Sequence, residues 1–137
     1  MPKFYPHKKL SENLEELLDL TLSKLYLLPD SNNPWAVLVP KRMKKDGAFV
    51  KEIHELSNDD QITLIKEITN ISEFMESEFA ADKMNVGALG NMVPQLHIHI
   101  IARFKNDKAW PGAIWGTPPG SDREKIADFR SKFSGFR

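Results

Sequence analysis

Two histidines in one apolar segment are the side chains of this sequence most suited to chemistry. His97 and His99 are separated by one residue in the stretch VPQLHIHIIARF, residues 93–104. If this segment is a β-strand, alternate side chains share a face, so Gln95, Arg103 and both histidines lie together, with the imidazoles about 7 Å apart. The opposite face is apolar and consists of Leu96, Ile98, Ile100 and Ala102. The segment therefore combines a core face with a face that is free to form a site.

Three interpretations of the histidine pair are open. Both side chains are ordinary polar residues on the open face of an antiparallel sheet, or they are ligands of zinc or iron, or one is a nucleophile that attacks a phosphate while the other stabilises charge. Metal binding lacks partners, because residues 100–104 hold no carboxylate and no histidine follows His99. We therefore expect no metal and no other cofactor. Phosphate binding needs backbone N–H donors, and the preceding loop, NVGALGN, contains two glycines.

The segment NVGALGNMVPQLHIHIIAR resembles the histidine triad family of nucleotide hydrolases and transferases, whose motif is His-φ-His-φ-His-φ-φ with φ apolar. It is more similar still to a bacterial branch that resembles diadenosine tetraphosphate hydrolases, in which glutamine replaces the first histidine. The similarity extends to Asp30 with NPWAVLVPKR, to EIHELSNDD, to DKMNVGALGN and to AWPGAIWG. It covers about residues 20–116.

This resemblance implies an α+β fold with a five-stranded antiparallel sheet, one long helix and short terminal helices. It also implies a homodimer formed through the long helix and the neighbouring strand. The implied reaction is cleavage at the α-phosphate of a purine nucleotide, either a dinucleoside polyphosphate or a nucleoside phosphoramidate, through a nucleotidyl-histidine intermediate. The alternative is a nucleotide-binding sensor or interaction protein that has lost turnover.

The resemblance assigns roles to individual residues. His97 corresponds to the nucleophile, His99 to a hydrogen-bond donor to phosphate oxygens, and Gln95 to the first position of the triad. The implied substrate contacts are Asp30, Asn85, Gly90 and Asn91. Arg103 shares the predicted strand face of the histidines and is a further candidate for binding a distal phosphate.

The nucleophilic role sets a requirement on the ring of His97. A neutral imidazole attacks phosphorus only if one nitrogen faces it while the other is held protonated by an acceptor such as a backbone carbonyl. The position of His97 between the buried residues Leu96 and Ile98 is expected to fix the ring in this way.

Three positions depart from the family pattern. Gln95 cannot titrate, so it can hold a phosphate or a water molecule without shuttling a proton. Trp35 stands where many members carry another active-site histidine, and Met92 replaces a serine or threonine that often precedes the motif. These departures predict slow hydrolysis or a different leaving group, and they favour the sensor alternative.

The elements that must position these residues follow from the periodicity of the sequence. Helices are predicted at residues 11–20, 58–80 and 122–133. Strands are predicted at residues 21–28, 35–39, 83–89 and 93–104. Ser57 is a good N-cap for the long helix. Strands followed by one long helix and then further strands indicate an α+β layer structure with an antiparallel sheet. The basic segment KRMKKDG is expected to be a solvated loop.

The long helix carries a wide apolar stripe. The residues predicted to face the sheet are Ile62, Ile65, Ile68 and Met75. Ile71 and Phe74 widen the stripe beyond what one core face requires, which predicts apolar surface for a second copy of the chain.

The remaining aromatic and histidine side chains are open to simpler interpretations. Trp110 and Trp115 lie in a Pro/Gly-rich tail and fold over the site, lie across a dimer seam or simply pack the tail. Trp35 either stacks on a base or lies in the core. His54 either reaches the site or is an ordinary loop or cap histidine, and His7 is assigned no role.

Length and composition exclude several classes of protein. A chain of 137 residues is expected to form one domain, 1–137. It has no cysteine, which excludes disulfides and thiolate metal sites. Its 19 basic and 19 acidic residues cancel, so we expect binding to neither nucleic acid nor membrane. No segment approaches the roughly 20 apolar residues of a membrane span, and the N-terminus lacks the pattern of a signal peptide. We therefore expect a cytoplasmic location.

Overall fold

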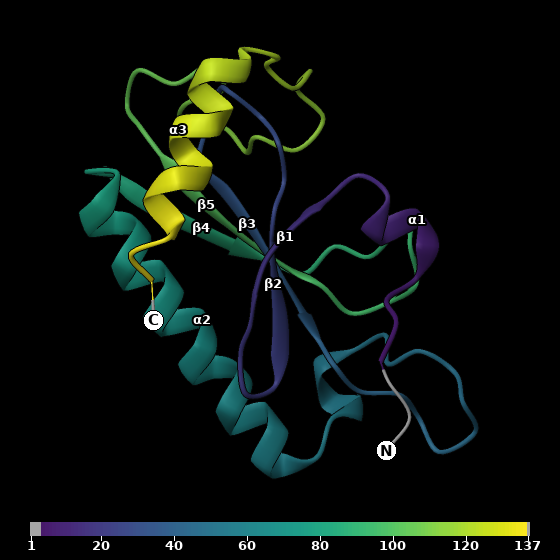
Figure 1. Ribbon diagram of the computed structural model, residues 1–137. Coiled ribbons are helices and arrows are strands. Elements are labelled where there is room, and N and C mark those ends of the chain that lie inside the picture. Colours follow the sequence, from purple (N-terminus) through teal and green to yellow (C-terminus); the bar gives the residue numbers. More distant parts are fainter. Residues whose placement is uncertain (1–3, 137) are drawn as a thin grey trace.

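A five-stranded antiparallel sheet forms the centre of the computed structural model, which describes residues 4–136 (Figure 1). Its strands are β1 (Glu15–Asp19), β2 (Ser23–Leu27), β3 (Trp35–Pro40), β4 (Lys83–Gly87) and β5 (Ile98–Arg103). Their order across the sheet is β1-β2-β3-β5-β4, and every neighbouring pair is antiparallel. The predicted α+β fold with a five-stranded antiparallel sheet is confirmed. The strand that carries His99 lies inside the sheet, between β3 and the edge strand β4.

The strand β1 corrects the helix predicted over residues 11–20. The helix α1 (Lys8–Ser11) ends where the predicted helix begins, and the chain then pairs with β2 as an antiparallel edge strand. The register shifts between Glu16 and Leu18, as it does at a β-bulge, and Leu17 and Leu18 both pack against the core. A bulge breaks the alternation of a strand. The leucine spacing therefore imitated a helical stripe.

The helix α2 (Asn58–Glu78) covers one face of the sheet. It begins as predicted, because the side-chain oxygen of Ser57 accepts a hydrogen bond from the backbone N–H of Asp60. Its apolar residues buried against the sheet are Leu64, Ile68, Ile71 and Met75. The helix α3 (Arg123–Phe133) packs near the C-terminal end of α2, where Phe133 enters the same core.

The stripe predicted for α2 is confirmed at Ile68 and Met75 and is wrong at Ile62, Ile65 and Ile71. The buried set follows positions 64, 68, 71 and 75, the spacing of one helical face. Ile62 and Ile65 lie outside this face and are each 55% exposed, whereas Ile71 is fully buried. The apolar surface that remains on α2 is therefore formed by Ile62 and Ile65 and not by Ile71.

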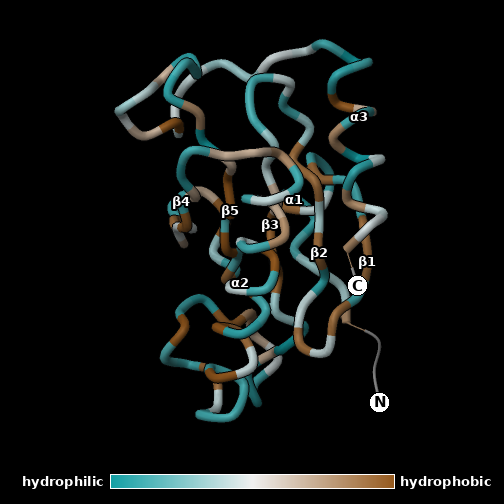
Figure 2. The backbone as a smooth tube through the Cα atoms, turned by 90° about the vertical axis from the view of Figure 1, so that its left-hand side faces the viewer, coloured by the Kyte–Doolittle hydropathy of each residue, from teal (hydrophilic) through white to brown (hydrophobic). Residues whose placement is uncertain are grey.

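The second face of the sheet is covered by segments from both ends of the chain. In Figure 1, α1 and α2 lie on opposite sides of the sheet. Leu10 of α1 and Ile114 of the C-terminal tail are buried in a cluster with Trp35, Val37 and Ile101 from the sheet. Figure 2 shows hydrophobic residues concentrated along β3 and β5, with more hydrophilic segments around them. The sheet thus has two apolar faces, and the histidines belong to the second.

The segment before β5 is not part of the sheet, although the strand was predicted from residue 93. β5 begins at Ile98, and the backbone N–H of Leu96 donates instead to the carbonyl of Val50, at 2.7 Å. Pro94 has no N–H to contribute to a ladder. The predicted alternation persists nevertheless, because Leu96 and Ile98 both face the α2 side. His97 therefore lies at the entrance of the strand and His99 within it.

Within residues 4–136, no helix combines the length and the apolar character that crossing a bilayer requires.

Candidate active site

The ring of His97 is held by the backbone of its own segment. Its Nδ1 lies 2.7 Å from the carbonyl oxygen of Gln95, and the side chain is 8% exposed. A carbonyl oxygen only accepts, so Nδ1 carries the proton and donates it. Nε2 is then the unprotonated nitrogen, with a lone pair available for attack. This is the arrangement that the sequence predicts for a nucleophilic histidine.

The ring of His99 is held in the opposite tautomer by Trp35 of β3. The indole Nε1–H donates to Nδ1 of His99 at 2.9 Å. Because an indole is only a donor, Nδ1 of the neutral ring must be the acceptor and Nε2 carries the proton. Burial, followed by the nearby charge of His97, lowers the pKa of His99 to about 4. At neutral pH His99 is therefore an uncharged donor through Nε2–H.

The two imidazoles are neighbours in space. Their ring centroids are 5.0 Å apart and the rings are tilted by 69°, so they lie closer than the 7 Å expected from strand spacing alone. One ring offers a lone pair and the other a proton. This is the complementary pair that attack on phosphorus requires.

Trp115 of the C-terminal tail folds over His99. Its ring centroid lies 5.8 Å from that of His99 and 6.2 Å from that of Trp35, in edge-to-face arrangements. The approach depends on Gly87 of β4, because a Cβ there would lie 3.0 Å from the indole. Of the interpretations left open for this tryptophan, these contacts fit folding over the site. Trp35, predicted either to stack on a base or to lie in the core, is 6% exposed and lies in the core.

A pocket of about 240 Å³ opens in front of the histidines. Its lining residues are Leu89, Gly90, Asn91, Met92, Val93, His97 and His99. Gly90 has a φ of +64°, a left-handed conformation that favours glycine. Among the described residues, none accepts a hydrogen bond from the backbone N–H of Gly90 or Asn91. The pocket thus brings four predicted site residues together and offers an anion neutral N–H donors.

Gln95 contacts His97 through its backbone carbonyl, whereas its side chain points to the N-terminal segment. The side chain is 2% exposed, and its Oε1 accepts a hydrogen bond from the backbone N–H of His7 at 2.6 Å. The ring nitrogen Nδ1 of His7 in turn accepts from the N–H of Lys9 at the start of α1. Within residues 4–136, Nε2 of Gln95 has no partner. The first triad position therefore anchors the N-terminal segment to the site.

Arg103 and Asn85 form a separate cluster beside the pocket. The guanidinium of Arg103 donates two hydrogen bonds to Asp107, one to Oδ1 of Asn85 and one to the carbonyl of Gly112. The side chains of Arg103 and Asp107 are each 2% exposed, and the hydrogen bonds from Arg103 hold the pKa of Asp107 well below its usual range. Neither Arg103 nor Asn85 lines the pocket. The cluster ties β4, β5 and the tail together.

Asp30 lies at the C-terminal tail and away from the pocket lining. Its Oδ1 accepts hydrogen bonds from the backbone N–H groups of Asn32, at 2.8 Å, and Gly120, at 2.9 Å. Asp30 is 3% exposed, and it does not line the pocket. Its contacts hold the tail against the loop that precedes β3.

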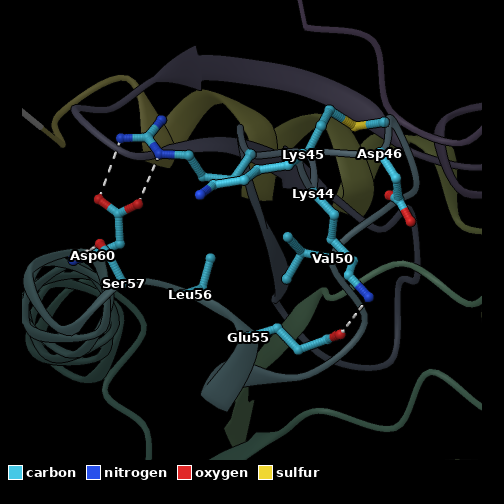
Figure 3. A pocket seen from close by; sticks show the side chains of 10 residues that line it. Lys44, Lys45, Asp46, Val50, Glu55, Leu56, Ser57 and Asp60 are labelled. Carbon is cyan, nitrogen blue, oxygen red and sulfur yellow. Dashed lines mark hydrogen bonds and ion pairs between the residues drawn. The ribbon is translucent and has the colours of Figure 1, made fainter.

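A second cleft, of about 580 Å³, lies between the basic loop and the start of α2 (Figure 3). The loop is exposed as predicted, and two ion pairs span the cleft, Arg42 with Asp60 and Lys44 with Glu55. Val50, on its floor, belongs to the core under α2. No histidine lines this cleft, so the candidate active site is the pocket at His97 and His99. Within the part of the chain that the structure describes, no three His, Cys, Asp or Glu side chains gather as a metal site.

Comparison with known proteins identifies the family to which the chain belongs. A model of the HIT domain matches residues 17–106, which is more than half of the sequence. The chain belongs to the HIT, or histidine triad, family. Membership supports a nucleotide-binding or nucleotide-hydrolysing type of function for this HIT domain. A search of curated proteins gave no match.

Solved structures of HIT proteins resemble this one over nearly the whole chain. A histidine triad protein from Bradyrhizobium japonicum is 39% identical, with a TM-score of 0.88 and 98% of each chain covered. One from Sinorhizobium meliloti is 33% identical, with a TM-score of 0.87, and the match covers 98% of this chain and 97% of the other. One from Marinobacter aquaeolei is 41% identical, with a TM-score of 0.85, covering 95% and 93%.

Three residues of this HIT site were not predicted in the roles that the structure gives them. Trp35 was noted as a departure from the family pattern, but not as the donor to His99. Trp115 was left open between the site, a dimer seam and plain packing, and His7 was assigned no role. Their contacts connect positions far apart in the sequence, 64 residues for Trp35 with His99 and 88 for His7 with Gln95. Strand periodicity carries no signal for such pairs.

Proposed function

We propose that this protein cleaves at the α-phosphate of a purine nucleotide, as a hydrolase or nucleotidyl transferase similar to the diadenosine tetraphosphate hydrolases. The observation that carries the proposal is the pair of complementary tautomers: a free lone pair on Nε2 of His97 beside a fixed N–H on His99. Membership of the HIT family supports the same class of chemistry.

The reaction has two displacements. In the first, Nε2 of His97 attacks the α-phosphorus, the N–P bond forms, and the bond to the leaving group breaks with its electron pair. A leaving phosphate oxygen departs as an anion, whereas a leaving nitrogen must also take up a proton. In the second, water attacks the α-phosphorus, the N–P bond breaks with its pair returning to Nε2, and a proton passes to solvent. His99 donates from Nε2–H to a phosphate oxygen in both steps, together with the backbone N–H groups of Gly90 and Asn91.

A nucleotide-binding protein without turnover is the second candidate, and a specific observation favours it. Gln95 is buried and bonded to the N-terminal segment, so it is neither titratable nor exposed to the pocket. Such a protein would keep the phosphate donors and lose the chemistry.

Turnover separates the two candidates. Purified protein is incubated with dinucleoside polyphosphates and nucleoside phosphoramidates, and the release of nucleoside monophosphate is followed by chromatography. Binding of the monophosphate is measured beside it by calorimetry. Release that depends on His97 supports the enzyme, whereas binding without release supports the sensor.

Two further parts of the proposal concern assembly and location. We propose that the protein is a homodimer that uses α2 and the edge strand β4, because Ile62, Ile65 and Val86 leave exposed apolar surface on these elements. We also propose a cytoplasmic location, in keeping with the absence of cysteine.

A further inference from the structure

We propose that Trp35 is a positioning residue that fixes His99 as an Nε2–H donor, and that this lock restricts the site to substrates whose leaving group departs as an anion. The preferred substrates are then phosphoanhydrides and not phosphoramidates. The inference rests on the proposed function and narrows its substrate class.

The geometry of the lock involves three side chains on three elements. Trp35 of β3 donates to Nδ1 of His99 on β5, and Trp115 from the tail closes over both rings. Trp35 is 6% exposed and His99 is 8% exposed, so water has little access to compete for Nδ1. An indole cannot accept a hydrogen bond through Nε1 and does not release its proton at neutral pH. A histidine at this position could do both.

The lock determines how protons can move at the site. If His99 gave its Nε2 proton to a leaving group, Trp35 could not replace that proton through Nδ1, and an imidazolate would remain. The proton of His97 is on Nδ1, bonded to the Gln95 carbonyl and not on the nitrogen that attacks. Among the described residues that line the pocket, no side chain other than these two histidines can titrate. The site therefore stabilises negative charge without supplying a proton.

Two classes of leaving group differ in whether they need a proton from the site. The bridging oxygen of a phosphoanhydride leaves as a phosphate anion, since the second pKa of a phosphate ester is about 6. In that step the N–P bond to His97 forms, the P–O bond breaks, and the electron pair stays on the phosphate. The nitrogen of a phosphoramidate would have to leave as an amide anion unless it received a proton. The anhydride should therefore react much faster than the amidate.

The state of His99 is tested by NMR of protein labelled with ¹⁵N in histidine. In the wild type at pH 7, Nε2 of His99 should show a one-bond coupling to a proton and Nδ1 should show none. In Trp35→Phe, His99 should become a mixture of both tautomers. Tyr26→Phe is the matched control, because Tyr26 is a buried aromatic residue of the same cluster whose hydroxyl has no partner in residues 4–136. A wild-type His99 protonated on Nδ1, or a single Nε2–H tautomer that survives in Trp35→Phe, overturns the lock.

The substrate preference is tested with two probes that share an adenylyl group, diadenosine tetraphosphate and adenosine 5′-phosphoramidate. The wild type should favour the anhydride in kcat/KM by at least about 100-fold, the lower end of what a general acid supplies. Trp35→Phe should lower kcat for the anhydride by about 10-fold with a smaller change in KM, because His99 is no longer held in its donor form. Equal turnover of both probes overturns the preference. If neither probe is turned over, the proposed function fails and the substrate class with it, while the NMR result still decides the role of Trp35.

Discussion

His97 and His99 differ in what their ring nitrogens can do, although a single residue separates them. The difference comes from the partner of each Nδ1: a backbone carbonyl accepts from Nδ1–H of His97, and an indole N–H donates to Nδ1 of His99, whose proton is therefore on Nε2. Residue type alone does not distinguish a nucleophile from a phosphate donor. The hydrogen bond on the far side of each ring does.

The role of His97 is tested by removing its ring. His97→Ala should abolish turnover while nucleoside monophosphate binding stays within a few-fold, because the attacking group contributes to the transition state more than to the ground state. Substrate labelled at the α-phosphate should leave an acid-labile, alkali-resistant label on the wild type after rapid quench and none on the variant. His54→Ala is the control, since His54 is exposed and outside the pocket. Wild-type turnover in His97→Ala would make the histidine pair structural.

The depressed pKa of His99 predicts a pH-dependent stability. The folded protein disfavours the charged ring, so the contribution of His99 is complete above its ordinary pKa of 6.5 and is lost as the pH falls toward 4. The loss is about 3 kcal/mol of unfolding free energy. Denaturant unfolding at pH 7 and pH 4 measures it, in the wild type and in His99→Gln. Carboxylates such as Asp107 titrate in both proteins, so the difference between the two isolates His99. Parallel pH curves would contradict the prediction.

The sequence indicated the position of the two histidines better than it indicated their hydrogen-bond partners. The alternation of polar and apolar residues around His97 and His99 placed Leu96 and Ile98 in the core and the histidines on the other face, and the structure agrees. The role of Trp35 could not be derived in this way, because its contact with His99 depends on the pairing of β3 with β5. Arg103 shares the predicted face, yet a buried ion pair with Asp107 occupies its guanidinium.

At the scale of elements, local irregularities decided which predictions failed. The register shift in β1 made a strand look like a helix, and Pro94 delayed the start of β5. The long helix was predicted well because its cap and length are strong local signals, whereas only part of its buried stripe was predicted correctly. Elements with uninterrupted periodicity can be predicted from one sequence. Strands with a bulge or a proline can be recognised only from the strands with which they pair.

The contact between β4 and the tail gives a prediction at this scale. Gly87→Ala places a methyl group about 3 Å from the Trp115 ring, which must move away from His99. We expect a loss of about 1–3 kcal/mol in unfolding free energy, as for other overpacked sites, together with a fall in kcat. Gly135→Ala is the matched control, because its nearest neighbour to an added Cβ is 3.6 Å away and its φ is not positive. Thermal unfolding and steady-state kinetics measure both effects. Unchanged activity in Gly87→Ala would show that Trp115 does not support the site.

At the scale of the whole molecule, both ends of the chain converge on the face that carries the site. The N-terminal segment reaches it through His7 and Gln95, and the tail reaches it through Trp115. The other face is closed by α2 and by Phe133 of α3. Exposed apolar residues remain on α2, at Ile62 and Ile65, and on the edge strand β4, at Val86.

The proposed dimer is tested at that surface. Ile62 and Ile65 are each 55% exposed on α2, and Val86 is 48% exposed on β4. β4 is an edge strand, and such a strand has backbone groups that can pair with another chain. Because a stable interface needs an apolar centre, a charge there should separate the subunits. Light scattering should give twice the 15.7 kDa chain mass for the wild type and the single chain mass for Ile65→Lys. Ile53→Lys is the control, since Ile53 is a similarly exposed isoleucine outside α2 and β4. A monomeric wild type at high micromolar concentration would contradict the dimer. An Ile65→Lys variant that stays dimeric would contradict this location of the interface.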